Sequence, residues 1–212
     1  PEGAGIAGLW FYEALGIPAA TADVNGVLLG DGVDVHTHGR VSRVNAVAAA
    51  CGVTVGMPVA DAAMLLLTTD PTAKAPSEIT NRTVMEEGPG GRAVVCTDSI
   101  AFGTPADRDT NVLVTAGHTG RSSVPYLRKF RPYGFICSDG GRGRDDSGVA
   151  GLAIVEADGL AGACVDARTA MMGDGLSSYR DGVVSARNAL AAARGVEVGM
   201  AARDAAHLLL FR

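Results

Sequence analysis

Lysine is scarce in this chain, because only two of the 18 basic residues are lysine, Lys74 and Lys129. The formal net charge is −5 and the pI is near 5.3, so no basic stripe can follow a phosphate backbone. Aromatic residues are also scarce, at 5% of the chain. Hydrophobic residues make up 47% and charged residues 19%, and this balance excludes disordered and collagen-like classes. We therefore expect a folded protein whose partner is a small molecule and not a nucleic acid.

The chain also lacks paired cysteines and a leader-like start. Its four cysteines form no CxxC pair and show no zinc-like spacing. The apolar stretch 3–22 has no basic residue before it and carries Glu13 in its middle, so it is not typical of a signal peptide. We expect a cytoplasmic protein without a membrane partner.

An internal repeat organises the sequence. Residues 5–67 align without gaps with residues 148–210 at an offset of 143, with 31 identities in 63 positions. The second copy is preceded by about sixty residues with strand-like runs, whereas the first is preceded by four. We predict a half unit at 1–70, a connecting arm at 71–91 and a complete unit at 92–212.

Three explanations of this asymmetry stay open. The first is descent from a longer two-unit protein that lost its leading half. The second is that the chain is the later part of a larger product. The third is that a partner subunit supplies equivalent structure. An upstream half repeat in the full gene product would distinguish them. Because repeat surfaces without a counterpart are left unpaired, we expect a homo-oligomer.

The complete unit alternates strands and helices, as is typical of a parallel sheet. Apolar runs predict strands at 93–97, 111–115, 133–138 and 160–165. Helices are predicted at 121–131, 146–157, 183–194 and 201–210, with a glycine-rich loop at 168–182. The half unit repeats the later part of this order: helix 6–15, strand 17–22, loop 25–39, helix 40–51 and helix 59–67. The expected fold is a three-layer α/β protein, a mostly parallel sheet with helices on both faces, built from one half unit and one full unit.

Ligands bind beyond the carboxyl ends of parallel strands, and that rule selects four strand ends here. They are Asp98-Ser99, residues 117–120, residues 139–141 and residues 166–168. If the four strands are parallel, carboxylates, an imidazole and several hydroxyls share one rim.

The stretch NVLVTAGHTGRSS carries the first group of candidates. His118 lies between glycines at a strand end, and Arg121, Ser122 and Ser123 open the next helix, whose free N–H groups attract anions. We expect His118 to act as acid or base, and Arg121 with the two serine amides to hold an anionic group. The alternative is a tight turn at Gly120 followed by a serine helix cap.

The stretch CSDGGRGRDDSG carries the second group. Asp139 follows a strand, Gly141 and Gly143 let the backbone approach a ligand, and Asp146 either contacts substrate or caps a helix. The glycine spacing fits neither a dinucleotide fingerprint nor a phosphate loop, so no cofactor is predicted. A divalent metal on His118 and Asp139 stays open.

Two further motifs have simpler interpretations. The duplicated Gly-Asp-Gly at Asp31 and Asp174 is first of all a turn signal. His36 and His38 form a His-x-His, a weaker metal candidate, because the pair lies in a predicted loop and is not repeated in the second unit.

We therefore expect an enzyme that acts on a small anionic or amide-bearing metabolite by acid–base chemistry, with His118, Asp98 and Asp139 as catalytic residues. Hydrolysis is favoured because nothing points to a redox or nucleotide cofactor. A lyase or isomerase could use the same groups. The alternative class is a non-catalytic metabolite-binding or assembly protein, in which the glycine loops serve turns and the repeat serves packing.

Overall fold

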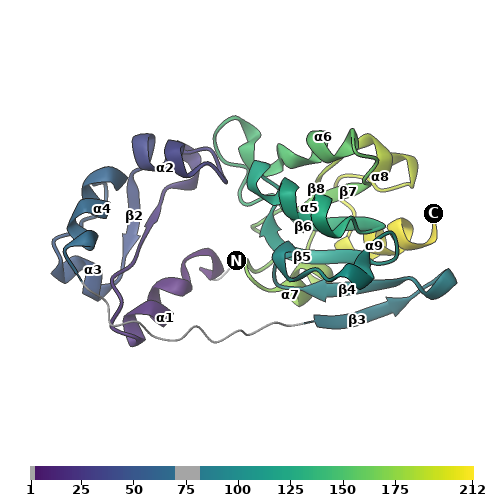
Figure 1. Ribbon diagram of the computed structural model, residues 1–212, viewed down its shortest axis with the longest axis horizontal. Coiled ribbons are helices and arrows are strands. Elements are labelled where there is room, and N and C mark those ends of the chain that lie inside the picture. Colours follow the sequence, from purple (N-terminus) through teal and green to yellow (C-terminus); the bar gives the residue numbers. More distant parts are fainter. Residues whose placement is uncertain (1–2, 70–81) are drawn as a thin grey trace.

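The computed structural model describes residues 3–69 and 82–212, and they form a mixed α/β protein (Figure 1). Its main feature is a six-stranded, mostly parallel sheet, which confirms the predicted class. The four inner strands run parallel, and an antiparallel strand joins at each edge. In sheet order the strands are β3 (Arg82–Glu87), β4 (Ala93–Thr97), β5 (Val112–His118), β6 (Gly134–Ser138), β7 (Gly162–Val165) and β8 (Val184–Arg187).

The inner strands form where apolar, often β-branched residues can be buried on both sides. In β4, Val94 and Cys96 enter one hydrophobic cluster and Val95 enters another, because successive side chains of a strand point in opposite directions. The last three helices, α7 to α9, contribute to the first cluster, and α5 and α6 contribute to the second. These helices are α5 (Val124–Phe130), α6 (Gly151–Glu156), α7 (Gly175–Arg180), α8 (Ala189–Ala193) and α9 (Ala202–Phe211).

Residues 3–69, called here the N-terminal segment, lie to one side of this sheet (Figure 1). Residues 82–212 are the C-terminal segment. The N-terminal segment has one antiparallel strand pair and a small core of Val41, Ala48, Val53 and Ala62. Its elements are α1 (Gly8–Ala14), β1 (Ala20–Ala22), α2 (Gly32–His38), β2 (Val41–Val44), α3 (Ala46–Ala50) and α4 (Val59–Leu67).

Asn45 and Asn188, which are aligned in the repeat, make the same hydrogen bonds. Asn45 Oδ1 accepts hydrogen bonds from the backbone N–H groups of Ala48 and Ala19 at 2.8 and 3.1 Å. Asn188 Oδ1 accepts from the aligned N–H groups, those of Ala191 and Gly162, at 3.0 and 3.1 Å. The helices predicted at 40–51 and 183–194 are wrong in their first halves, which form β2 and β8. Each asparagine caps the short helix that follows, because its side chain competes with helical backbone bonding and favours the N-cap.

The loops predicted at 25–39 and 168–182 each contain a helix, α2 and α7. Asp31 and Asp174 are the N-caps, and each carboxylate accepts a hydrogen bond from the backbone N–H three residues on, at 3.0 and 2.9 Å. The Gly-Asp-Gly motif therefore starts a helix here.

Two other boundaries differ from expectation. Arg82–Glu87, within the expected connecting arm 71–91, forms the edge strand β3, while residues 71–81 of that arm lie outside the described residues. The helix predicted at 146–157 begins later, as α6 at Gly151, because Asp145 and Asp146 have φ of 55°. That conformation interrupts a right-handed helix.

Candidate functional site

His118 ends β5 at the carboxyl edge of the sheet, beside Ser138 of β6. Its Nδ1 accepts a hydrogen bond from the backbone N–H of Gly120 at 2.9 Å. A neutral imidazole that accepts at Nδ1 carries its proton on Nε2. Burial lowers the pKa of His118 below its ordinary value of 6.5. At neutral pH the side chain is therefore an uncharged hydrogen-bond donor through Nε2.

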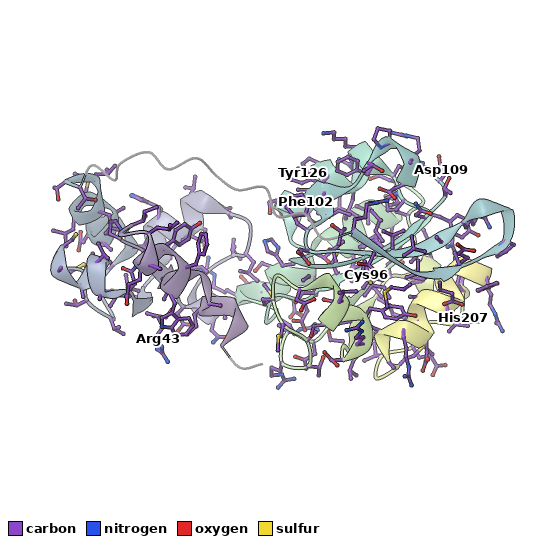
Figure 2. The ribbon with its side chains drawn as sticks, turned by 90° about the horizontal axis from the view of Figure 1, so that it is seen from below. Arg43, Cys96, Phe102, Asp109, Tyr126 and His207 are labelled. Carbon is purple, nitrogen blue, oxygen red and sulfur yellow. The ribbon has the colours of Figure 1, made fainter. Side chains whose placement is uncertain are left out.

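A cleft of about 280 Å³ adjoins this imidazole, a volume suited to a small metabolite. Ser123 is buried and donates to the Gly120 carbonyl at 2.8 Å, whereas Ser122 is exposed. Ser99 follows β4 and accepts from the Ala101 N–H at 3.2 Å. Tyr126, labelled in Figure 2, is the aromatic side chain of the cleft. The cleft is lined by Ser99, Ile100, Ala101, Gly117, His118, Ser122, Ser123 and Tyr126.

Asp139 is buried, and its carboxylate is fully engaged beside the neighbouring strands. It accepts from the backbone N–H groups of Gly141 and Ala167 at 2.8 and 3.0 Å and from Ser185 Oγ at 2.8 Å. Asp139 is not among the residues that line the His118 cleft. Gly141 and Gly143 shape the same loop with φ of 79° and 70°, a region that favours glycine.

The other two predicted carboxylates also have protein partners. Asp98 accepts a hydrogen bond from the backbone N–H of Gly175, where α7 begins, at 3.1 Å. Asp146 pairs with Arg142 at 2.7 Å, and the hydrogen bond from that guanidinium lowers the pKa of Asp146. The alternative that Asp146 caps α6 is wrong, because Ala150 holds that position.

Arg121 lines a different and larger cleft, of about 610 Å³, between the two segments. One wall is formed by residues 28–33 of the N-terminal segment, which lead into α2, and the other includes Asp145 and Ser147. The sequence predicts that Arg121, Ser122 and Ser123 hold one anionic group. In the structure Arg121 lines one cleft and the two serines line another.

Sequence reasoning missed the residues that join the two segments at this rim. Asp34, only 8% exposed, forms an ion pair with Arg144 and contacts His38 Nδ1 at 3.0 Å. The hydrogen bond from the Leu28 N–H, with those from Arg144 and His38, holds the pKa of Asp34 below its ordinary value. The only sequence signal is the charged run Arg144-Asp145-Asp146, which does not reveal a partner 110 residues away.

The described residues contain no group of three or more His, Cys, Asp or Glu side chains that could hold a metal ion. His36 and His38 lie on α2 and not in a loop. Residues two apart on a helix do not face each other, so the two imidazoles do not converge.

No protein-family model, curated protein or solved structure matches the chain. Within the part of the chain that the structure describes, no helix has the length and apolar character needed to cross a membrane.

Proposed function

We propose that this protein is an enzyme that binds a small anionic or amide-bearing metabolite in the His118 cleft and acts on it by acid–base chemistry. One observation carries the proposal: the His118 imidazole, with Nδ1 held by the Gly120 N–H, lines a small cleft with three serines. Nε2–H is then the group left for a ligand. A positioned neutral donor can stabilise negative charge as it develops on a carbonyl oxygen.

Hydrolysis is the favoured reaction. The Nε2–H group of His118 donates a hydrogen bond to the carbonyl oxygen, and the hydroxyls of Ser99 and Ser122 bind the substrate. Water attacks the carbonyl carbon, and the carbonyl bond to the leaving oxygen or nitrogen breaks. The proton that the water loses passes through solvent to that leaving atom. Asp98 and Asp139 serve as positioning residues, because each holds a loop at the same sheet edge. Arg121 lines the neighbouring cleft, so it binds an anionic group only when the substrate is long enough to extend from the His118 cleft into that one. A lyase or isomerase remains the alternative reaction class.

We also infer that the two segments are copies of one unit, a half and a full one, and that the sheet is the middle of three layers. The repeat alignment and the matched bonds of Asn45 and Asn188 support the first inference. The division of β4 between two hydrophobic clusters supports the second. The cytoplasmic location and the homo-oligomer stay predictions.

The proposal is tested with p-nitrophenyl acetate, N-acetylglycine and acetamide as ester, anionic amide and neutral amide probes. We expect the protein to hydrolyse at least one of them, and His118→Gln to lower kcat by about 100-fold or more at unchanged Tm. His207→Gln is the matched control, because His207 is an exposed histidine on α9 paired with Glu86. An equal kcat in His118→Gln would overturn the role of His118. Saturable binding without turnover would favour the non-catalytic alternative.

A further inference from the structure

A cleft of about 570 Å³ lies beside β1 of the N-terminal segment. Five of its lining residues are Gly5, Ala22, Val24, Leu29 and Ser42. Gly140 and Met172 of the C-terminal segment also line it. The residues 143 positions further on from the five are Gly148, Val165, Ala167, Met172 and Ser185. They hold the loop that follows β6, residues 138–142.

Three of these counterparts bind Asp139 of that loop, one through its backbone and two through its carboxylate. Asp139 donates its backbone N–H to the Val165 carbonyl at 2.8 Å. Its side chain accepts from the Ala167 N–H at 3.0 Å and from Ser185 Oγ at 2.8 Å. Val165, Ala167 and Ser185 align with three lining residues of the N-terminal cleft, at positions 22, 24 and 42.

The two remaining counterparts hold the ends of the same loop. Gly148 donates its N–H to the Arg142 carbonyl at 2.6 Å. Ser138 Oγ donates to the sulfur of Met172 at 3.3 Å. Gly148 and Met172 align with positions 5 and 29. These five positions, which hold the loop in the C-terminal segment, therefore correspond to five residues that line the cleft.

The strand beside the cleft has a free edge. β7 lies between β6, in parallel, and β8, in antiparallel. Its counterpart β1 pairs with β2 alone among the described strands. An open strand edge presents backbone groups that another strand can pair with.

The exposure of matched side chains also differs between the two segments. Leu67 of α4 is 76% exposed, whereas its counterpart Leu210 is fully buried in the cluster formed with β4, β5 and β6. Val55 and its counterpart Val198 are exposed alike, at 60% and 61%. Figure 1 shows α3 and α4 on the side of the N-terminal segment away from the six-stranded sheet. Leu67 is therefore exposed at the position where, in the C-terminal segment, strands β4, β5 and β6 cover the matching leucine.

We propose that the β1 edge, the 570 Å³ cleft and the face of α4 around Leu67 together bind a partner polypeptide of the same kind as residues 82–147. Its strand runs parallel to β1 and ends in an Asp-Gly loop that fills the cleft. The aspartate accepts hydrogen bonds from Ser42 Oγ and the Val24 N–H. This inference rests on the repeat and is independent of chemistry at His118.

A second copy of this chain is a poorer occupant. Its own β6 and Asp139 are already bound to β7 and Ser185, so offering them would expose the surface they cover. A small ligand would fill the cleft but would leave the strand edge and Leu67 uncovered.

The test adds the occupant to the full chain. A second copy of residues 82–147 is fused directly before Gly5, in the register in which those residues precede Gly148. We expect amide exchange in β1 to slow by at least about 100-fold relative to the natural chain, as for amides that enter a stable sheet. Leu67→Arg in the fusion should abolish this protection. Val55→Arg, at a position exposed in both segments, should retain it.

Two results would overturn the proposal. One is unchanged β1 exchange in the fusion, or equal loss of protection with both arginines. The other comes from sedimentation of the natural chain. A dimer that Leu67→Arg dissociates and Val55→Arg does not would show that a second copy covers the face, whereas a chain whose mass neither change affects supports a separate partner.

Discussion

The backbone N–H of Leu29 donates a hydrogen bond to Oγ of Ser147 at 2.9 Å, across 118 residues of sequence. Glycines make room for this leucine, because a Cβ on Gly140 would come within 2.8 Å of its side chain. A Cβ on Gly143 would come within 3.1 Å. This contact ties the N-terminal loop to the rim of the six-stranded sheet.

Ser147→Ala should loosen that tie. The Leu29 N–H loses its acceptor, so we expect stability to fall by about 0.5–1.5 kcal/mol and the Leu29 amide to exchange faster. Urea denaturation and hydrogen exchange measure the two effects. Ser99→Ala, at a serine in the His118 cleft, is the control and should leave Leu29 exchange unchanged. Identical exchange in both variants would contradict the assignment.

Asn188→Ala should destabilise strongly, because Asn188 is buried, caps α8 and bonds the backbone at the start of β7. Loss of a cap and of buried hydrogen bonds together costs about 2–4 kcal/mol. Urea denaturation should also show Asn45→Ala losing stability. Asn25→Ala, at an exposed position, should cost under about 0.5 kcal/mol. Losses as small at Asn45 and Asn188 would contradict the account.

Asp107 should make stability depend on acid. Burial alone would raise the pKa of Asp107. Hydrogen bonds from Arg82, Asn111 and Thr104 nevertheless hold this pKa below its ordinary value of 3.8. A lowered folded-state pKa stabilises above the unfolded value, and this contribution is lost as pH falls below 3.8 toward the folded value. Asp107→Asn should lower stability by about 3–5 kcal/mol at pH 7 and flatten its dependence on pH in the acid range, as read by denaturation from pH 6 to 2. Equal acid slopes in the two proteins would refute this.

The thiols should differ in reactivity. Burial raises the pKa of Cys96 to about 12 and also raises the pKa values of Cys137 and Cys164. Cys51 is half-buried. Since the thiolate is the nucleophile, one thiol should react with Ellman's reagent at pH 8 in the native protein and four in denaturant. Rapid reaction of two or more native thiols would contradict the buried core; Cys51→Ser should abolish the native reaction.

The sequence predicts the inner sheet well, because runs such as 93–97 and 111–115 are apolar and both sides of those strands are buried. The edge strands escaped prediction for a physical reason. β3 is Arg-Thr-Val-Met-Glu-Glu, and its pairing depends on backbone hydrogen bonds to β4 more than on an apolar pattern. β8 was hidden because four residues of strand run directly into a helix capped by Asn188.

At the site, the strand-end rule predicts neighbours but not side-chain directions. It brought His118, Ser99 and the Ser122–Ser123 pair to one cleft. The rule does not predict that the carboxylate of Asp139 accepts a hydrogen bond from Ser185, because Ser185 lies in β8 and the sequence pattern did not predict that strand. The inter-segment contact of Leu29 depends on how two distant segments pack, which no local pattern encodes.

The most direct measurement of the central claim is the pH titration of His118 by long-range ¹H–¹⁵N NMR, with and without N-acetylglycine. We predict the Nε2–H tautomer at pH 7, a pKa of His118 below 6.5 because of burial, and a shift of the Nε2 resonance on adding the ligand. His118→Gln should weaken binding of the ligand. An Nδ1–H tautomer, a pKa above 6.5, or a ligand that binds without perturbing His118 would contradict the account.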